Sequence, residues 1–140
     1  MDKPLRVLFL CTGNSCRSQM AEGWARRLGA GRVEAYSAGV SPIRVVPATG
    51  EVMAEVGVDI SSQRSKAADV FVGEEFDYII TLCDNARENC PYFPGEAQRL
   101  HWSVEDPYGL DLDAYRRSRD DIRRRLEEFL AAVLGGDGGV

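Results

Sequence analysis

The chain has 140 residues, enough for one domain with a sheet covered on both faces. Its 17 basic and 22 acidic residues are interspersed and give a formal net charge of −5, which excludes a general basic surface for nucleic acid. No stretch approaches the roughly 20 apolar residues of a membrane span. The charged N-terminus runs directly into a predicted strand, unlike a signal peptide, so we expect a cytoplasmic protein that binds no membrane.

The first predicted strand and helix enclose a loop of small residues. The strand is Leu5–Leu10, an apolar run interrupted by a single arginine, and this pattern predicts a central parallel strand buried on both faces. The helix begins at Ser15 or Cys16, and its core residues recur at spacings of three and four: Met20, Ala21, Trp24 and Leu28. Gly29 and Gly31 are expected to end it.

Later elements continue the alternation of strand and helix. Further strands are predicted at Val33–Ala38, Asp77–Leu82 and, more weakly, Gln98–Trp102; further helices are predicted at Pro47–Val56 and Leu112–Leu134. The last helix has a solvated face of arginines opposite an apolar face of Tyr115, Ile122, Leu126, Phe129 and Val133. The pattern predicts a single α/β domain over residues 1–134, a four-stranded parallel sheet with helices on both faces, and a flexible Gly-rich tail at 135–140.

The loop after the first strand is the most informative segment of the chain. It has the sequence Cys-Thr-Gly-Asn-Ser-Cys-Arg-Ser at residues 11–18. A strand that passes through small residues into a helix aims backbone N–H groups at one point, and the helix N-terminus adds positive potential, so a tetrahedral oxyanion fits there. Arg17 offers a planar fork for two oxygens. The expected substrate-binding residues are Thr12, Gly13, Asn14, Ser15, Cys16, Arg17 and Ser18.

Cys11 is the candidate nucleophile of this loop. A free cysteine has a pKa near ~8.5, but a helix N-terminus and a nearby cation lower it to roughly 3.5–7.5. Ser18 is placed to donate a hydrogen bond to the sulfur, and Asn14 is expected to fix the loop backbone through its side chain. The alternative is a cysteine that only packs beneath a turn; the preceding strand, the glycine and the following helix favour the nucleophile.

The other cysteines indicate chemistry rather than structural disulfides, because the chain shows no export signal. Zinc is disfavoured: neither Cys11 and Cys16 nor Cys83 and Cys90 have the C-x2-C spacing, and the chain has one histidine, so we expect no metal site. In a parallel sheet the strand-to-helix loops share one edge. We therefore expect Cys11, Cys83 and Asp106 to converge there, although a lone Asp-Pro pair commonly only begins a turn.

With these residues identified, the sequence resembles the low-molecular-weight tyrosine phosphatase fold family, and within it the thioredoxin-coupled arsenate reductases. The similarity runs nearly end to end and rests on residues 11–24 (CTGNSCRSQMAEGW), Tyr36–Gly39, Glu55–Ser61, Thr81–Cys83, Cys90-Pro91, His101-Trp102 and Asp106-Pro107. The phosphatases share the first loop and the Asp-Pro pair. The pair Cys83 and Cys90 distinguishes the reductases.

The resemblance implies reduction of arsenate to arsenite, for arsenic detoxification, by a three-cysteine relay. Cys11 would attack arsenic, Cys83 would attack the Cys11 sulfur, and Cys90 would take over the disulfide with Cys83 for reduction by thioredoxin. Asp106 would be the general acid, Arg17 would hold the oxyanion, and Cys16 would have a supporting or protective role. Phosphate or sulfate would compete with arsenate. We expect a monomer without a bound cofactor.

Alternatives remain open at this point. A phosphatase acting on phosphotyrosine or aryl phosphates would use Cys11, Arg17 and Asp106 with Tyr108 nearby, and would need no thiol reductant. A non-catalytic redox-sensing module that binds anions is less consistent with Arg17 and Asp106. In the redox-sensing module the thiols would report oxidation to a partner. For Cys83 and Cys90 themselves the alternative is two unrelated buried thiols. The polar segment 84–89 between them is expected to form a short helix or a mobile loop.

One departure from the family concerns potassium. Related reductases often hold a potassium ion beside Asn14 and Glu22 with a hydroxyl residue and an acid from the segment 63–66, where this chain has Arg64 and Lys66. We expect the Lys66 ammonium to pair with Glu22 or to lie behind the loop in place of the ion. The alternative is a simple exposed lysine.

Overall fold

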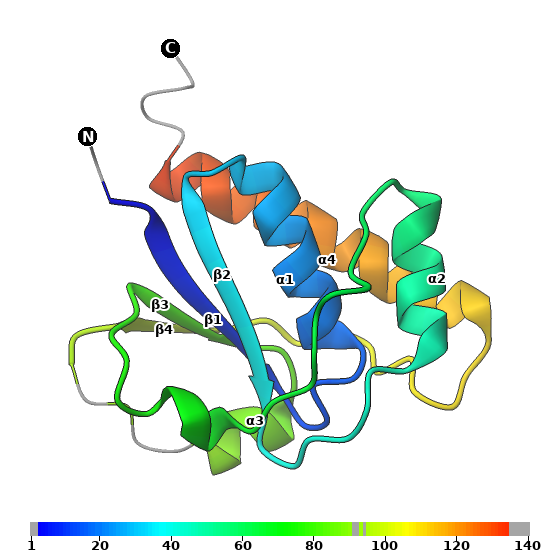
Figure 1. Ribbon diagram of the computed structural model, residues 1–140, viewed down its shortest axis with the longest axis horizontal. Coiled ribbons are helices and arrows are strands. Elements are labelled where there is room, and N and C mark those ends of the chain that lie inside the picture. The colour runs from blue at the N-terminus through cyan, green and yellow to red at the C-terminus, as the bar shows by residue number, and fades with distance from the viewer. Residues whose placement is uncertain (1–2, 91–92, 94, 135–140) are drawn as a thin grey trace.

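A computed structural model describes residues 3–90, 93 and 95–134 of the chain. Its sheet has four parallel strands in the order β2-β1-β3-β4, with bounds β1 Leu5–Cys11, β2 Val33–Gly39, β3 Tyr78–Thr81 and β4 Gln98–His101. All three strand pairings are parallel, and the arrow of β2 points toward the lower part of the molecule in Figure 1. The predicted α/β class and all four predicted strands are confirmed.

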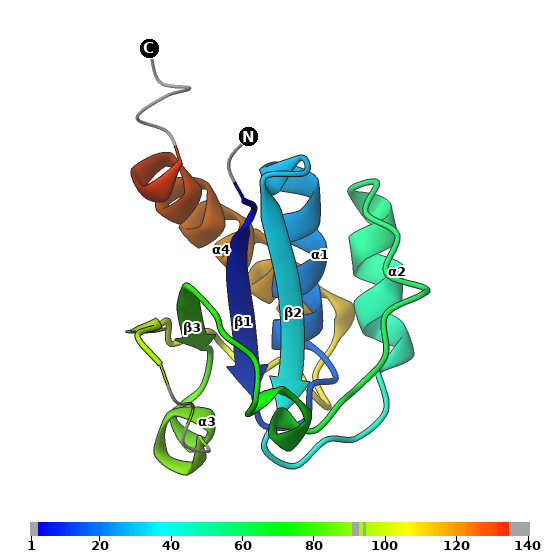
Figure 2. The same cartoon turned by 60° about the vertical axis from the view of Figure 1, so that its left-hand side comes forward.

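Strand β1 is buried on both faces, as its apolar run predicts. Val7 and Phe9 belong to the core on one face, Leu8 and Leu10 to the core on the other, and all four are 0% exposed. Helices α1 (Arg17–Gly29) and α4 (Leu112–Val133) cover the first face (Figure 2). Helix α2 (Pro47–Glu55) packs on α1 and α4 rather than on the sheet.

The second face has a thinner cover. It is formed by a 3-10 helix, η1 (Ala68–Phe71), by the short helix α3 (Asp84–Asn89), and by the buried rings of Phe71, Phe76 and Phe93. η1 was not predicted, because four residues are too few to display helical periodicity. The segment 84–89 forms a helix, one of the two conformations expected for it.

The apolar face of α4 is largely as predicted, but one of its arginines is not solvated. Tyr115, Ile122 and Leu126 are buried, and so is Arg119, which is 8% exposed. Arg119 lies four residues after Tyr115 and three before Ile122, so it shares their face. Its guanidinium donates to the Val52 carbonyl at 3.0 Å and pairs with a carboxylate of α2, so this arginine ties α4 to α2.

The end of helix α1 differs from the prediction. Helix α1 ends with Ala30 in the left-handed conformation (φ 48°), whereas Gly29 is required by packing, since a Cβ there would lie 2.7 Å from Val33. Across the described residues 3–90, 93 and 95–134, no helix is long and apolar enough to cross a membrane. The predicted tail at 135–140 lies outside the described residues.

Candidate active site

The loop between β1 and α1 wraps around the sulfur of Cys11. Asn14, at its centre, has φ 51°, in the left-handed region that Asn tolerates better than most residues. Its N–H donates to Cys11 Sγ at 3.3 Å, while its side-chain Nδ2 donates to the hydroxyls of Ser18 (2.8 Å) and Ser37 (3.0 Å). Its Oδ1 accepts from the Lys66 N–H at 2.8 Å. Asn14 therefore fixes the loop through its side chain, as predicted.

Strand β2 supports the same loop from the side. Gly39, paired with Cys11 across the sheet, lies so close that a Cβ there would come within 2.6 Å of the Thr12 carbonyl oxygen. A side chain at this position would push the loop away from the strand. Gly39 is therefore a structural requirement of the loop, and the sequence contains it in the Tyr36–Gly39 segment.

Cys11 is 2% exposed, and its electrostatic environment differs from the prediction. The Ser18 hydroxyl oxygen lies 2.8 Å from the sulfur. Burial raises the pKa of the Cys11 thiol, and the hydrogen bonds from Ser18 and Asn14 and the charge of Arg17 act to lower it. The predicted net lowering of this pKa was wrong for this conformation, because the sulfur is shielded from water and desolvation is the largest influence.

Arg17 and Asp106 meet at the mouth of the loop. Arg17 Nη2 lies 3.5 Å from Asp106 Oδ2, and Arg17 Nη1 donates to the Val104 carbonyl at 3.1 Å. The Arg17 side chain is 10% exposed, whereas that of Asp106 is 56% exposed. The Asp106 carboxyl is thus held beside the loop by a buried guanidinium and is still open to water.

The structure also brings Cys83 to this loop. Cys83 follows β3, and its sulfur lies 3.3 Å from the Thr12 hydroxyl oxygen. The Ala86 N–H, in the first turn of α3, donates to the same sulfur at 3.4 Å, and Asn85 Nδ2 donates to Thr12 Oγ1 at 3.0 Å. The predicted convergence of Cys11, Cys83 and Asp106 on one edge of the sheet is therefore present in the fold.

Cys90 is placed differently. It is the half-buried C-cap of α3, and Arg99 Nη1 donates to its sulfur at 3.8 Å. Residues seven apart in a regular helix are about 10.5 Å apart along the axis, beyond the ~7 Å between Cα atoms that a disulfide spans. All four cysteines are free thiols in this conformation, and a bond between Cys83 and Cys90 requires α3 to change.

Cys16 faces away from the anion side of the loop. Its sulfur is buried against α4, 4.0 Å from the Tyr115 hydroxyl, where burial and the neighbouring Cys16 raise the pKa of Tyr115 to about 12. The expected contribution of Cys16 to anion binding is thus limited to its backbone.

A buried polar cluster lies behind the loop and was only partly anticipated. Ser37 donates to Glu22 Oε1 at 2.6 Å, and Arg26 pairs with Glu22 Oε2 at 2.5 Å. Lys66 is half-buried; burial lowers the pKa of its ammonium, and the charge of Glu22 acts to raise it. The Lys66 ammonium donates to the Arg64 carbonyl, and the Glu22 carboxylate is paired with Arg26 rather than with Lys66 as predicted. A carboxylate already paired with a guanidinium does not fit a resident potassium ion. Among the described residues, no group of three or more His, Cys, Asp or Glu side chains could hold a metal.

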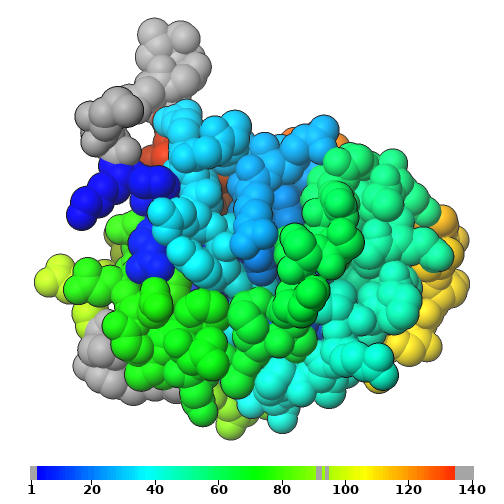
Figure 3. Space-filling model, viewed as in Figure 1, coloured from blue at the N-terminus to red at the C-terminus, as the bar shows by residue number. Residues whose placement is uncertain are grey.

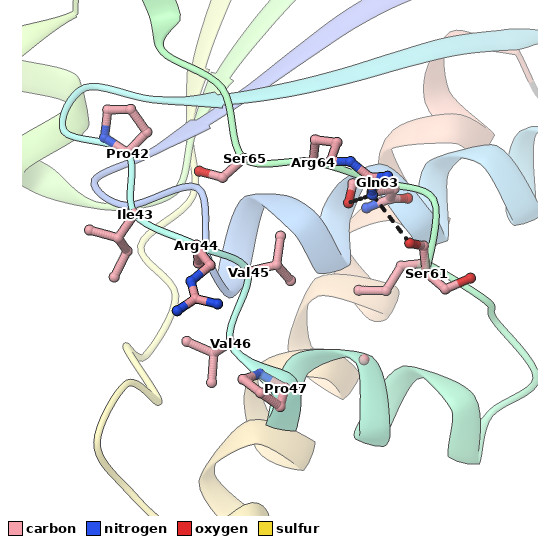
Figure 4. Close-up of a pocket in the computed structure, with 12 residues that line it drawn as sticks. Pro42, Ile43, Arg44, Val45, Val46, Pro47, Ser61, Gln63, Arg64 and Ser65 are labelled. Atoms are coloured by element: carbon pink, nitrogen blue, oxygen red, sulfur yellow. Dashed lines mark hydrogen bonds between the residues drawn. The ribbon is translucent and has the colours of Figure 1, made fainter.

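A groove of about 660 Å³ lies beside the loop, between segments 42–47 and 60–65 (Figure 4). Its lining touches the loop through Gly13, whose carbonyl oxygen accepts from the Ile43 N–H at 2.9 Å and from the Ser65 hydroxyl at 3.2 Å. The two segments also lie side by side on the molecular surface, in cyan and green in Figure 3. None of the groove's lining residues belongs to 11–18, so the groove is not the anion site. The segments that line it support the nucleophile loop from outside.

Comparison with known proteins agrees with this geometry. Residues 6–136 match the family model for the low molecular weight phosphotyrosine protein phosphatases. The arsenate reductase of Staphylococcus xylosus is 43% identical over 129 residues, covering 92% of this chain and 98% of its own. An arsenate reductase solved in a phosphate-binding state superposes with a TM-score of 0.80 at 38% identity, covering 92% and 98% of the two chains.

A phosphatase of the same fold is somewhat more distant. The low molecular weight protein tyrosine phosphatase from T. tengcongensis superposes with a TM-score of 0.77 at 29% identity, covering 92% of this chain and 99% of that one. The nucleophile loop, the parallel sheet and these similarities lead to one conclusion: the chain belongs to the low molecular weight phosphotyrosine protein phosphatase family, and within it resembles the arsenate reductases.

Proposed function

We propose that this protein reduces arsenate to arsenite, and that Cys11, Cys83 and Cys90 become oxidised in that order as the oxidising equivalents pass outward. The observation that supports this most directly is the position of the second thiol: Cys83 Sγ lies 3.3 Å from the Thr12 hydroxyl oxygen, beside the loop that surrounds Cys11. A phosphatase needs no thiol there. Similarity to arsenate reductases over 92% of the chain favours the same activity.

The first half of the reaction uses the loop and Asp106. Backbone N–H groups of the loop and Arg17 bind the oxyanion, which requires Arg17 to share or leave its contact with Asp106. The Cys11 thiolate forms a bond to arsenic while one arsenic–oxygen bond breaks, and Asp106 supplies a proton so that the oxygen leaves as water. Phosphate and sulfate have similar shape and charge and compete for the site.

The second thiol, Cys83, makes the reaction of arsenate differ from that of phosphate. Cys83 attacks the Cys11 sulfur, a sulfur–sulfur bond forms, and the electron pair of the sulfur–arsenic bond stays on arsenic. Arsenic is thereby reduced from the pentavalent to the trivalent state, and the two cysteines are oxidised to a disulfide. A phosphorus adduct cannot accept this electron pair and can only be hydrolysed, so the loop itself need not discriminate between the two anions.

Cys90 would then carry the oxidising equivalents outward. Its thiolate attacks Cys83, the Cys83–Cys90 disulfide forms, and Cys11 leaves as a thiolate. Thioredoxin, a dithiol protein of the reducing cytoplasm, would reduce the new disulfide. Because α3 separates the two sulfurs, we expect the α3 amides to lose protection from hydrogen exchange on oxidation. Equal protection in the reduced and oxidised protein would contradict this step.

The deciding experiment couples arsenate to NADPH oxidation through thioredoxin and thioredoxin reductase. Wild-type protein should consume NADPH, whereas Cys83→Ser and Cys90→Ser should not, and both variants should still hydrolyse an aryl phosphate if the loop is intact. Untouched NADPH with fast ester hydrolysis in all three proteins would instead identify a phosphatase. That second candidate is supported by Tyr108, which is 56% exposed two residues after Asp106, where it could contact an aryl substrate.

A further inference from the structure

Arg99 is the charged side chain that contacts the third cysteine. It is exposed on β4, and Nη1 donates to Cys90 Sγ at 3.8 Å. Nη2 donates to the Phe93 carbonyl at 3.2 Å, and the guanidinium carbon lies 6.0 Å from the centre of the Phe93 ring. Phe93 is 3% exposed and belongs to the core of the second sheet face. The guanidinium is thus anchored to a buried residue while it reaches the thiol.

We propose that Arg99 is a positioning residue for the relay, one that holds the sulfur of Cys90 at the end of α3 and favours its ionisation when it attacks Cys83. The proposal rests on the proposed function, because a thiolate at Cys90 matters only if Cys90 is a nucleophile. The thiolate is the reactive form in thiol–disulfide exchange. Attack forms the Cys83–Cys90 bond, breaks the Cys11–Cys83 bond and leaves the electron pair on Cys11.

The electrostatic balance at Cys90 supports this role. Burial is the largest influence and raises the pKa of the Cys90 thiol, while the charge of Arg99 and its hydrogen bond act to lower it. Removing Arg99 would take away both of these opposing contributions. Hydrogen bonds to charged groups are stronger than those between neutral groups, and partial exposure weakens them through solvent screening. Removing Arg99 should therefore reduce the thiolate population of Cys90 at neutral pH by roughly three- to tenfold.

The contact with Phe93 also bears on whether Arg99 can stay close to Cys90 when Cys90 moves. Cys90 must move toward Cys83 before the two sulfurs can bond, and the anchored guanidinium is bound to a residue three positions further along the same segment. A long arginine side chain tied to this segment can follow the sulfur part of the way. A lysine would keep the charge but lose the fork that contacts both partners.

The first test measures Cys90 alone, so that it does not depend on arsenate chemistry. In a protein carrying Cys11→Ser, Cys16→Ser and Cys83→Ser, the pH dependence of Cys90 alkylation by iodoacetamide should move to higher pH with Arg99→Gln, and alkylation at pH 7 should slow roughly three- to tenfold. Arg99→Lys should recover part of the loss. Arg87→Gln is the matched control: this exposed α3 arginine pairs with Asp84 at 3.5 Å.

The second test follows the relay in a single turnover, with arsenite release and the appearance of the Cys83–Cys90 disulfide measured by mass spectrometry. Arg99→Gln should slow disulfide appearance relative to arsenite release by a similar factor at pH 7, and the difference should shrink as the pH rises. An unchanged alkylation profile, or an equal shift in Arg87→Gln, would overturn the role of Arg99. A normal shift in alkylation with no Cys83–Cys90 disulfide in wild-type protein would instead overturn the relay.

Discussion

Ser18→Ala should lower the reactivity of Cys11 at neutral pH. The Ser18 hydroxyl oxygen lies 2.8 Å from Cys11 Sγ, and Ser18 is fully buried, so no water can take its place without rearrangement. A hydrogen bond to a charged group contributes about 1.5–3 kcal/mol, and about 1.4 kcal/mol corresponds to a tenfold change in population. The thiolate population of Cys11, and its rate of alkylation, should fall about 10- to 100-fold.

The alkylation rate of Cys11 should rise with pH, and the burial of its sulfur sets the pH range in which it rises. Burial raises the pKa of Cys11, so the thiolate fraction grows as the pH rises, and the loss of the Ser18 hydrogen bond raises that pKa further. The variant profile should therefore lie at higher pH than that of the wild type. The two rates should approach each other only at pH values where both thiols are ionised.

Alkylation by iodoacetamide measures this directly in a protein with Cys16, Cys83 and Cys90 replaced by serine. Ser37→Ala is the matched control, since it removes one hydrogen bond from Asn14 but does not contact the sulfur. Ser37→Ala should change the alkylation rate much less than Ser18→Ala. The reasoning fails if Ser18→Ala leaves the profile unchanged, or if both variants move it equally, because the effect would then come from loop distortion.

Three further predictions concern charge and packing. Turnover should be nearly the same in potassium and sodium buffers, since Lys66 and Arg26 lie near Glu22; strong activation by potassium alone would refute this. Hydrogen bonds from two arginines of α4 lower the pKa of Glu55 to about 2. Glu55 therefore stabilises the fold above its ordinary pKa and loses that contribution as the pH falls toward about 2. In Glu55→Gln the unfolding temperature should fall less steeply with decreasing pH than in the wild type. Leu126→Ala, at a fully buried position, should cost about 2–5 kcal/mol in denaturant unfolding, and Leu110→Ala, at a position 55% exposed, should cost little.

The sheet was predictable because its central strand carries a strong local signal, whereas the signal of β4 was weaker. β1 is apolar on both faces, and only a central strand of a covered sheet needs that pattern. The convergence of Cys83 and Asp106 on the nucleophile loop followed from topology alone, since parallel strands place their carboxyl ends at one edge. Chain order and strand type were sufficient to assemble the site before any distance was known.

The electrostatic environments of individual side chains were harder to predict from the sequence. The direction of the Cys11 pKa depends on how completely the loop excludes water, and that is set by contacts with distant segments such as Gly39 and Lys66. Arg119 was assigned to a solvated face because arginine is seldom buried, yet its register on α4 directs it toward α2. Arg99 gave no signal in the sequence, because its contacts with Cys90 and Phe93 arise only in the folded protein.

The arrangement of the three thiols explains how an anion-binding loop could support a reductase. The loop supplies binding and a nucleophile, and neither distinguishes arsenic from phosphorus. Discrimination needs a thiol close enough to reach the first sulfur, and Cys83 is held beside the loop by the Thr12 hydroxyl and by the first turn of α3. In the proposed relay, recycling needs a third thiol outside the loop, and Cys90 lies at the other end of that helix. In the proposed relay the six-residue helix α3 would serve both needs, because its first turn contacts the Cys83 sulfur and a helix this short is marginal by itself, so we expect it to open when Cys83 and Cys90 form a disulfide.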